Sequence, residues 1–217
     1  RQMCIRDSTN GGVVGQLPLG TAANGTSSKR TVYTNRKINA SNVAEEADSL
    51  QSVNLNTLFA TGTDGKFRND ARKNYWLNIL GYNVDINATG LTVATLPTAE
   101  RRQLGAVMHS KPVLLTQEGK VVATNGVVST TGRKDYLLFG STQGSLHVVK
   151  VGSDTDTDRG QEVFTFVPNE MIENKPQAFL SENAVSGGRD NLFYGIDGAW
   201  TAYTPVSYTP LRAHETR

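Results

Sequence analysis

The sequence predicts a mainly β protein, and the stretch Tyr136–Pro168 carries most of that prediction. Two apolar runs, Tyr136–Phe139 and Leu146–Val151, flank a turn-forming Ser-Thr-Gln-Gly cluster. In a third run, Glu162–Val167, valine and threonine alternate with phenylalanine. Short β-rich runs separated by glycine-bearing turns are typical of a β-meander, so we expect one antiparallel sheet in sequential order. Four residues are expected to be mostly buried: Leu146, Val148, Phe164 and Phe166.

Both faces of this meander are largely apolar, which indicates a sheet that is covered on both sides. The blades of a β-propeller are covered in this way by their neighbours, and about four to eight blades are needed for closure. Leu192–Ile196 has the composition of the next blade's first strand. The sequence therefore predicts an incomplete β-propeller, about one blade plus the start of another, preceded by a loop-rich region with short helices. Such a piece leaves strand edges and an apolar face uncovered.

The loop-rich region is expected to hold a few short elements. Thr9–Arg30 is rich in Gly, Ser, Thr, Asn and Ala and is typical of a linker. Thr31–Thr34 is expected to be a short strand. A helix is expected over Asn42–Leu50, because Asn can cap it, Glu follows three residues later and the apolar residues share one face. A second helix is expected over Asn69–Gly81, where glycine is a natural C-terminal stop.

Two further elements flank the meander. Val113–Thr116 and Lys120–Thr124 surround a Gln-Glu-Gly sequence, which predicts a hairpin that turns there. After Pro168, we expect a short helix that Asn169 caps and that carries an acidic residue in its first turn. Pro176 is expected to limit that helix.

The two ends of the chain differ in kind from the rest. Arg1–Ser8, RQMCIRDS, and Val206–Arg217, VSYTPLRAHETR, resemble translated sequencing-adapter sequence; genuine termini are the alternative. Such segments are set aside before fold reasoning, and we expect them to make few tertiary contacts. The sequence is thus expected to be a fragment. Its expected divisions are adapter-like residues 1–8, a pre-propeller region 9–103, a partial β-propeller 104–205 and adapter-like residues 206–217.

Composition excludes several kinds of site once the ends are set aside. The chain has 22 basic and 20 acidic residues, and 18 of each remain without the ends, so charge gives no sign of a nucleic-acid partner. The single cysteine, Cys4, lies in an adapter-like end. This excludes a disulfide, a cysteine zinc site and a thiol nucleophile from the rest. No apolar run approaches the roughly 18 residues of a membrane span.

The sharpest candidate for chemistry is an acidic turn between the second and third predicted strands. Asp154, Asp156 and Asp158 alternate there, and such an arrangement brings several oxygens around Ca2+, a hard cation. A calcium loop requires glycine directly after its third acidic residue, whereas Arg159 intervenes here. The alternative is a solvated hairpin loop, in which Asp, Thr and Gly are ordinary turn residues. Calcium is the one candidate cofactor.

Two histidines remain outside the ends. His109 lies beside Ser110, and a Ser/His pair suggests nucleophilic catalysis. Residues adjacent in sequence seldom hold triad geometry, however, and the G-x-S-x-G elbow is missing from the sequence. His147 lies within a predicted strand between two apolar residues, which favours a hydrogen-bonded core or inter-blade residue. No catalytic residue is assigned, and the protein is not expected to be an enzyme.

Three motifs occur in a fixed order within Leu104–Tyr203: LGAVMHSKP at Leu104–Pro112, the meander core, and YGIDG at Tyr194–Gly198. In this order they resemble the C-terminal β-propeller of the PilC/PilY type IV pilus assembly proteins. Ala106 departs from the family, which usually has Asp there. The core follows the pattern GxxxGxLHxxx…GxExFxFVPxEMI. Its matching residues are Gly140, Gly144, Leu146, His147, Gly160, Glu162, Phe164, Phe166, Val167, Pro168, Asn169, Glu170 and Met171.

The resemblance implies a fragment of a type IV pilus biogenesis factor or fimbrium-associated adhesin. Such a protein is exported to the bacterial outer membrane and cell surface. It acts by protein binding in pilus assembly, in opposing retraction, in cell adhesion and in twitching motility. Its implied partners are pilus-tip subunits and a host surface. Members of the family carry a calcium loop in the propeller, but that loop does not align with Asp154, Asp156 and Asp158.

An enzyme is the alternative. The sequence GSLHVVK…GQEVFTF is faintly similar to the blades of quinoprotein dehydrogenases, which also form β-propellers. Against this alternative, the chain has no vicinal cysteine pair and no cluster of charges that would grip a quinone cofactor.

Overall fold

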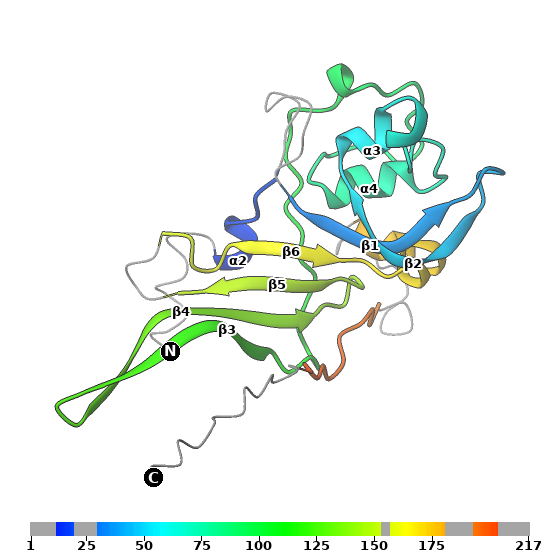
Figure 1. Ribbon diagram of the computed structural model, residues 1–217. Helices are drawn as coiled ribbons and strands as arrows, with labels where there is room; N and C mark the ends of the chain where they lie inside the picture. Colours follow the sequence, from blue (N-terminus) through cyan, green and yellow to red (C-terminus); the bar gives the residue numbers. More distant parts are fainter. Residues whose placement is uncertain (1–11, 20–29, 153–156, 181–192, 204–217) are drawn as a thin grey trace, which may run out of the picture.

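The computed structural model describes residues 12–19, 30–152, 157–180 and 193–203, and a six-stranded sheet dominates them (Figure 1). The fold of the described residues is therefore mainly β. Its strands are β1 (Val32–Ile38), β2 (Ala44–Val53), β3 (Val113–Thr124), β4 (Val127–Gly140), β5 (Leu146–Val151) and β6 (Glu162–Phe166). Its helices are α2 (Gly12–Gly15), α3 (Leu55–Phe59), α4 (Lys73–Ile79) and α5 (Asn169–Asn174), with 3-10 turns η3 (Gly62–Asp64), η4 (Val93–Thr95) and η5 (Pro176–Phe179).

The strand order is β2-β1-β6-β5-β4-β3, so the first hairpin is attached to the end of the meander rather than to its start (Figure 1). Neighbouring strands are antiparallel except β1 and β6, which are parallel and pair Val32 with Thr165 and Tyr33 with Phe166. The sheet thus joins the predicted regions 9–103 and 104–205 in one hydrogen-bonded unit.

The predicted meander is confirmed. Strands β4, β5 and β6 are antiparallel neighbours in sequential order, with Leu138 opposite Val148 and Val148 opposite Phe164. The predicted burial is confirmed: Val148 is buried, and Leu146, Phe164 and Phe166 are mostly buried but keep some exposed surface. They lie on the same face of the sheet, and no described element covers that face fully.

The predicted turn of the hairpin that precedes the meander is wrong. β3 runs unbroken through the Gln-Glu-Gly sequence, and the pairing with β4 only shifts register around Glu118. The turn lies at Asn125-Gly126, where both residues have positive φ, 51° and 77°. Two consecutive residues of positive φ suit a two-residue hairpin turn, for which Asn-Gly is the strongest short signal. The Gln-Glu-Gly glycine is instead accommodated as an irregularity within the strand.

The predicted helix over Asn42–Leu50 is also wrong, because this segment forms the turn and the first part of β2. The side-chain oxygen of Asn39 accepts hydrogen bonds from the amides of Ser41 and Val43, and Asn42 has a positive φ of 61°. Asparagine supports turns through both properties. Pairing along β1 then outweighs the weak helical preference of the segment.

The helix before Gly81 is confirmed, although it begins later than predicted. α4 starts at Lys73, and Asp70 accepts a hydrogen bond from the Arg72 amide just before it. All but the first two residues of α4 are buried. Gly81 follows with a φ of +105° and packs closely against Leu19, which explains why the helix stops there. The sequence analysis did not anticipate α3, which an Asn54–Thr57 capping box starts.

The apolar core lies at the β1–β2 end of the sheet. Figure 1 shows α3 and α4 over that end, and α5 lies beside it. The buried residues of this core come from the predicted loop-rich region, from β1 and β2, and from the segment after β6. Its largest fully buried side chains are Trp76, Tyr82, Phe67, Leu55 and Leu58. Strands β3 to β5 therefore extend away from the main core.

Two predictions after the meander need correction. α5 begins with Pro168 rather than Asn169 as its N-cap, because the Asn169 side chain is engaged by Arg36. Leu192 lies outside the described residues, and instead of the predicted strand Phe193 and Tyr194 are irregular and Gly195 and Ile196 lie in a turn. None of the described helices has the length and apolarity that crossing a bilayer requires.

Candidate functional site

The acidic turn is only partly described. Asp154 and Asp156 lie outside the described residues. Asp158 makes an ion pair with Lys150 of β5, and the hydrogen bond from this lysine lowers the pKa of the carboxyl group. No group of three potential metal ligands occurs within the described ranges. In the structure, the Asp158 carboxylate is paired with a lysine, and calcium binding at this turn stays a prediction.

Asp197 joins two of the three sequence motifs. Its carboxylate accepts hydrogen bonds from the backbone amides of Met108, His109 and Ser110, at 3.0, 2.9 and 2.8 Å. The His109 ring nitrogen Nδ1 lies 3.3 Å from the same carboxylate. Burial alone would raise the pKa of Asp197, but these donors hold it below its usual range. The YGIDG motif therefore fixes the backbone of the LGAVMHSKP motif.

The third motif meets the other two at Gly140. The Ser110 hydroxyl oxygen accepts a hydrogen bond from the Gly140 amide at 3.0 Å. A side chain at Gly140 would collide with the carbonyl of Ile196 and with the Trp200 ring nitrogen. The Ser141 carbonyl accepts a further hydrogen bond from the Ile196 amide at 3.3 Å. All three motifs thus converge at the end of β4, and we call this contact the motif junction.

Ala106 takes part in this contact through its backbone. Its amide donates to the Thr142 hydroxyl and its carbonyl accepts from the Thr142 amide, both at 2.9 Å. The side chain itself is exposed. A carboxylate is therefore not needed at this position to hold the loop in this chain.

The side chains of the predicted Ser/His pair have separate partners. Ser110 is buried against Gly140, whereas the His109 side chain is 60% exposed and stacks near Tyr194, with ring centroids 6.0 Å apart. The Ser110 hydroxyl is bonded to the Gly140 amide and the His109 ring contacts Asp197, so the two side chains are directed to different partners. This arrangement gives no support for a Ser110–His109 nucleophile.

A different serine lies beside a different histidine. The Ser141 hydroxyl is 3.2 Å from His147 Nε2, and His147 Nδ1 is 2.7 Å from Glu162 Oε1. Ser141, His147 and Glu162 follow the hydrogen-bond order of a catalytic triad. Two observations oppose catalysis. Ser141 is fully buried, and the Glu162 carboxylate also holds the Arg30 guanidinium through two hydrogen bonds of 2.6 and 2.9 Å.

The protonation states of Glu162 and His147 follow from burial and from the neighbouring charges. Burial alone would raise the pKa of Glu162, but the Arg30 charge and the hydrogen bonds from His147 and Arg30 lower it to about 2. Burial lowers the pKa of His147. The geometry thus describes a neutral imidazole beside a salt-bridged carboxylate. The prediction of His147 as a hydrogen-bonded core residue is confirmed.

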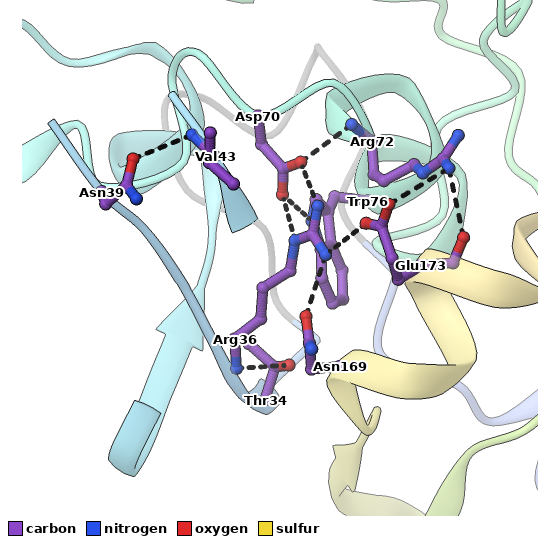
Figure 2. Close-up of polar contacts among 9 residues, drawn as sticks. All are labelled: Thr34, Arg36, Asn39, Val43, Asp70, Arg72, Trp76, Asn169 and Glu173. Atoms are coloured by element: carbon purple, nitrogen blue, oxygen red, sulfur yellow. Dashed lines mark hydrogen bonds and ion pairs between the residues drawn. The ribbon is translucent and has the colours of Figure 1, made fainter. Parts of the chain in front are cut away.

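A second buried charge cluster surrounds Arg36 of β1. Figure 2 shows its guanidinium between Asp70, which precedes α4, and two residues of α5, Asn169 and Glu173. Asp70 accepts two hydrogen bonds from Arg36, at 2.8 and 2.9 Å, and one from the Trp76 indole at 2.9 Å. Arg36 is only 1% exposed. The cluster fixes α4 and α5 to the sheet.

The sheet face opposite the buried clusters is apolar and open. Register places Tyr136, Leu138, Val148 and Phe164 on this face. They line a hollow of about 430 Å³ together with Leu115 of β3. This volume lies within the range of ligand pockets, and its lining offers apolar contact rather than catalytic groups.

Arg30, Arg36 and Asp70 are buried charges that were not predicted from the sequence. One local signal existed: in β1, Val32, Thr34 and Arg36 alternate on the inward face, so the strand period places Arg36 inside. Their partners could not be found in this way, because Arg30 contacts Glu162 across 132 residues and Arg36 contacts Asn169 across 133.

Comparisons with known proteins give no match. No family model, curated protein or solved structure matches this chain. Function is therefore argued from the motif junction, the buried clusters and the open apolar face.

Proposed function

We propose that this chain is part of a PilC/PilY-like type IV pilus factor and that it acts by binding other proteins. One observation carries the proposal: the three motifs that resemble the family meet in the motif junction, through Asp197, Ser110 and Gly140. The three motifs lie apart in the sequence, but their residues contact one another in a single local structure. This is expected when a resemblance reflects a shared fold and is not expected of chance matches.

The proposal includes the finer fold, a partial β-propeller. Support comes from the antiparallel order of β4, β5 and β6 and from the partly exposed aromatic residues Phe164 and Phe166 on one face. A blade within a closed propeller is covered on both faces by its neighbours. The open face is where the proposal requires a further blade of the parent protein.

The burial of one polar group and the exposure of another favour binding over catalysis. The arrangement with triad order, Ser141–His147–Glu162, lies under the surface and its carboxylate is paired with Arg30. By contrast, the exposed loop positions Met108, His109 and Tyr194 are held by the motif junction. Exposed loops on a rigid scaffold are common binding positions. In the proposal, such loops contact pilus-tip subunits at the bacterial cell surface.

The direct test is deletion of the parent gene in its bacterium. Surface pili are counted by electron microscopy in strains with and without the retraction motor, and twitching zones are measured. We expect few pili and no twitching when the motor is present, and partial recovery of pili when it is removed. Normal piliation and normal twitching in the deletion strain would refute the pilus proposal and would promote the quinoprotein alternative.

Complementation then tests the motif junction. An Asp197→Ala gene is expected to restore fewer pili than the unaltered gene, because three backbone amides lose their acceptor. The control is Asp48→Ala, which removes an exposed carboxylate of β2. Protein amounts are compared by immunoblot, so that a loss of protein is separated from a loss of function. Full complementation by Asp197→Ala would separate the motif junction from pilus function.

A further inference from the structure

The buried cluster of Arg30, Ser141, His147 and Glu162 joins three separate parts of the chain, and we call it the Glu162 cluster. Arg30 lies just before β1, Ser141 follows β4, and His147 and Glu162 belong to β5 and β6. Each of the four residues is at most 5% exposed. Arg30 also donates a 2.6 Å hydrogen bond to the carbonyl of Ile79, the last residue of α4. The cluster therefore connects the sheet to the main core.

One carboxylate serves two basic groups in this cluster. Arg30 approaches Glu162 with Nε at 2.6 Å and Nη2 at 2.9 Å, and His147 Nδ1 lies 2.7 Å from the same Oε1 atom that accepts from Nη2. A proton on Nδ1 satisfies this last contact while the ring stays neutral. Nε2 then faces the Ser141 hydroxyl, which can donate to it.

The surroundings of His147 oppose a second proton on its ring. Burial is the largest effect on the ring and lowers its pKa, and Phe139 of β4 stacks on it at 5.4 Å; a hydrogen bond to the Leu104 backbone acts in the opposite direction and raises the pKa, but does not outweigh burial. Among the described residues, the charged groups that act on it are Glu162 of β6, which is attractive, and Arg30, which is repulsive. A proton would place a second cation on a carboxylate that already holds Arg30, without access to water. Burying a charge under such conditions is costly.

We propose that the Glu162 cluster is an acid-sensitive joint, in which protonation of His147 loosens the attachment of β5 and β6 to the Arg30 segment. This inference does not depend on the proposed pilus function. The Ser141–His147–Glu162 order of hydrogen bonds resembles that of a catalytic triad. In this proposal its role is a conformational response to acid.

The expected pH window follows from the direction of the pKa shift. Burial lowers the pKa of His147 below its usual 6.5 in the closed state, whereas an opened joint lets the ring titrate normally. Between pH 6.5 and the lowered pKa of the closed state, the open state binds up to one more proton than the closed state. The equilibrium constant for opening is therefore expected to rise by up to tenfold for each unit of acidification in this window. Glu162 contributes in the same direction only below its ordinary pKa of 4.5.

Amide hydrogen exchange of the full chain, read by mass spectrometry between pH 7 and pH 5, tests the proposal. Rates are divided by the intrinsic exchange rate at each pH. Peptides that cover β5 and β6 are expected to lose protection by up to about tenfold per unit below pH 6.5. In His147→Gln, which keeps a neutral donor toward Glu162, this slope is expected to vanish. His109→Gln removes an exposed histidine of the motif junction and is expected to keep the slope. Equal slopes in the unaltered chain and in His147→Gln would overturn the proposal.

A second measurement does not require any variant to fold. The 15N shifts of the ring nitrogens of His147 report its protonation in the unaltered chain, which has three histidines. At pH 7 they are expected to show a neutral ring with its proton on Nδ1. An imidazolium ring at pH 7, or ordinary titration near pH 6.5 without loss of protection in β5 and β6, would refute the acid-sensitive joint.

Discussion

Buried charges carry much of the specific structure at the scale of single residues. Arg36 and Asp70 are 1% and 4% exposed, and each makes several hydrogen bonds to the other or to Trp76, Asn169 and Glu173. Burial alone would lower the pKa of Arg36, but its contacts with Asp70 and Glu173 raise it above its usual value. A cluster of this kind is satisfied only when all its members are present.

Removing one charged member of the Arg36 cluster is therefore expected to lower the free energy of unfolding more than replacing two members with apolar residues. Asp70→Asn leaves the guanidinium of Arg36 buried with a weakened partner, and we expect a loss of about 3–5 kcal/mol in the free energy of unfolding. The double variant Arg36→Met with Asp70→Leu removes both charges and is expected to be more stable than either of its component single variants, Arg36→Met and Asp70→Leu. Urea unfolding of the unaltered chain and of these four variants measures this. Additive losses in the double variant would contradict a coupled cluster.

At the scale of elements, turns decide where the strands end. The hairpin of β3 and β4 turns at Asn125-Gly126, although the Gln-Glu-Gly sequence nearby also predicts a turn. The difference is conformational: the observed turn needs two residues of positive φ, which Asn and Gly tolerate best. The long hairpin that results projects away from the main core (Figure 1).

Gly126→Ala is expected to destabilise this hairpin, because a φ of +77° is unfavourable for a residue with a Cβ. We expect a loss of about 1 kcal/mol. The control is Gly198→Ala, at a glycine without positive φ and with open space around it. Exchange protection of the β3 and β4 amides is compared in the two variants. Similar protection in both would show that the turn tolerates a side chain.

The acidic turn between β5 and β6 is the candidate calcium site. If it binds calcium, titration calorimetry on the intact parent propeller is expected to show clearly weaker binding in Asp156→Ala. The ion pair of Asp158 with Lys150 has to open for this, so Lys150→Ala is expected to strengthen binding. Equal calcium affinity in the unaltered protein and Asp156→Ala would remove this turn from consideration.

At the scale of the whole molecule, acid is expected to destabilise the chain further below pH 4.5. The pKa of Glu162 is lowered from 4.5 to about 2 in the folded state, so the unfolded state binds more protons as the pH falls between these values. This amounts to about 3 kcal/mol of stability, present above pH 4.5 and lost toward pH 2. Urea unfolding at successive pH values measures it, with Asp48→Asn as a control that alters an exposed carboxylate of β2. A flat profile below pH 4.5 would contradict the salt bridge with Arg30.

The parts that could be predicted from the sequence depend on local patterns. The meander follows from apolar runs and turns, and α4 follows from its apolar face and Gly81. The β1–β2 hairpin was missed because pairing between strands outweighed the helical preference of Asn42–Leu50. Within the candidate site, His147 was predicted as a core residue from its apolar neighbours. Its partners were not: the Arg30–Glu162 contact spans 132 residues and leaves no periodic trace, and the contact of His147 with Glu162 depends on how β5 pairs with β6.

The separation between Arg36 and its α5 partners sets an order of events during synthesis. Arg36 emerges from the ribosome 133 residues before Asn169, and β6, the parallel neighbour of β1, also comes late. At roughly 5–20 residues per second, this delay is about 10 s. During that time the β1–β2 hairpin lacks one neighbouring strand, and the guanidinium lacks two of its acceptors. A ribosome that stalls before residue 169 therefore releases a product that cannot close its own core, and such nascent chains are natural clients for a chaperone.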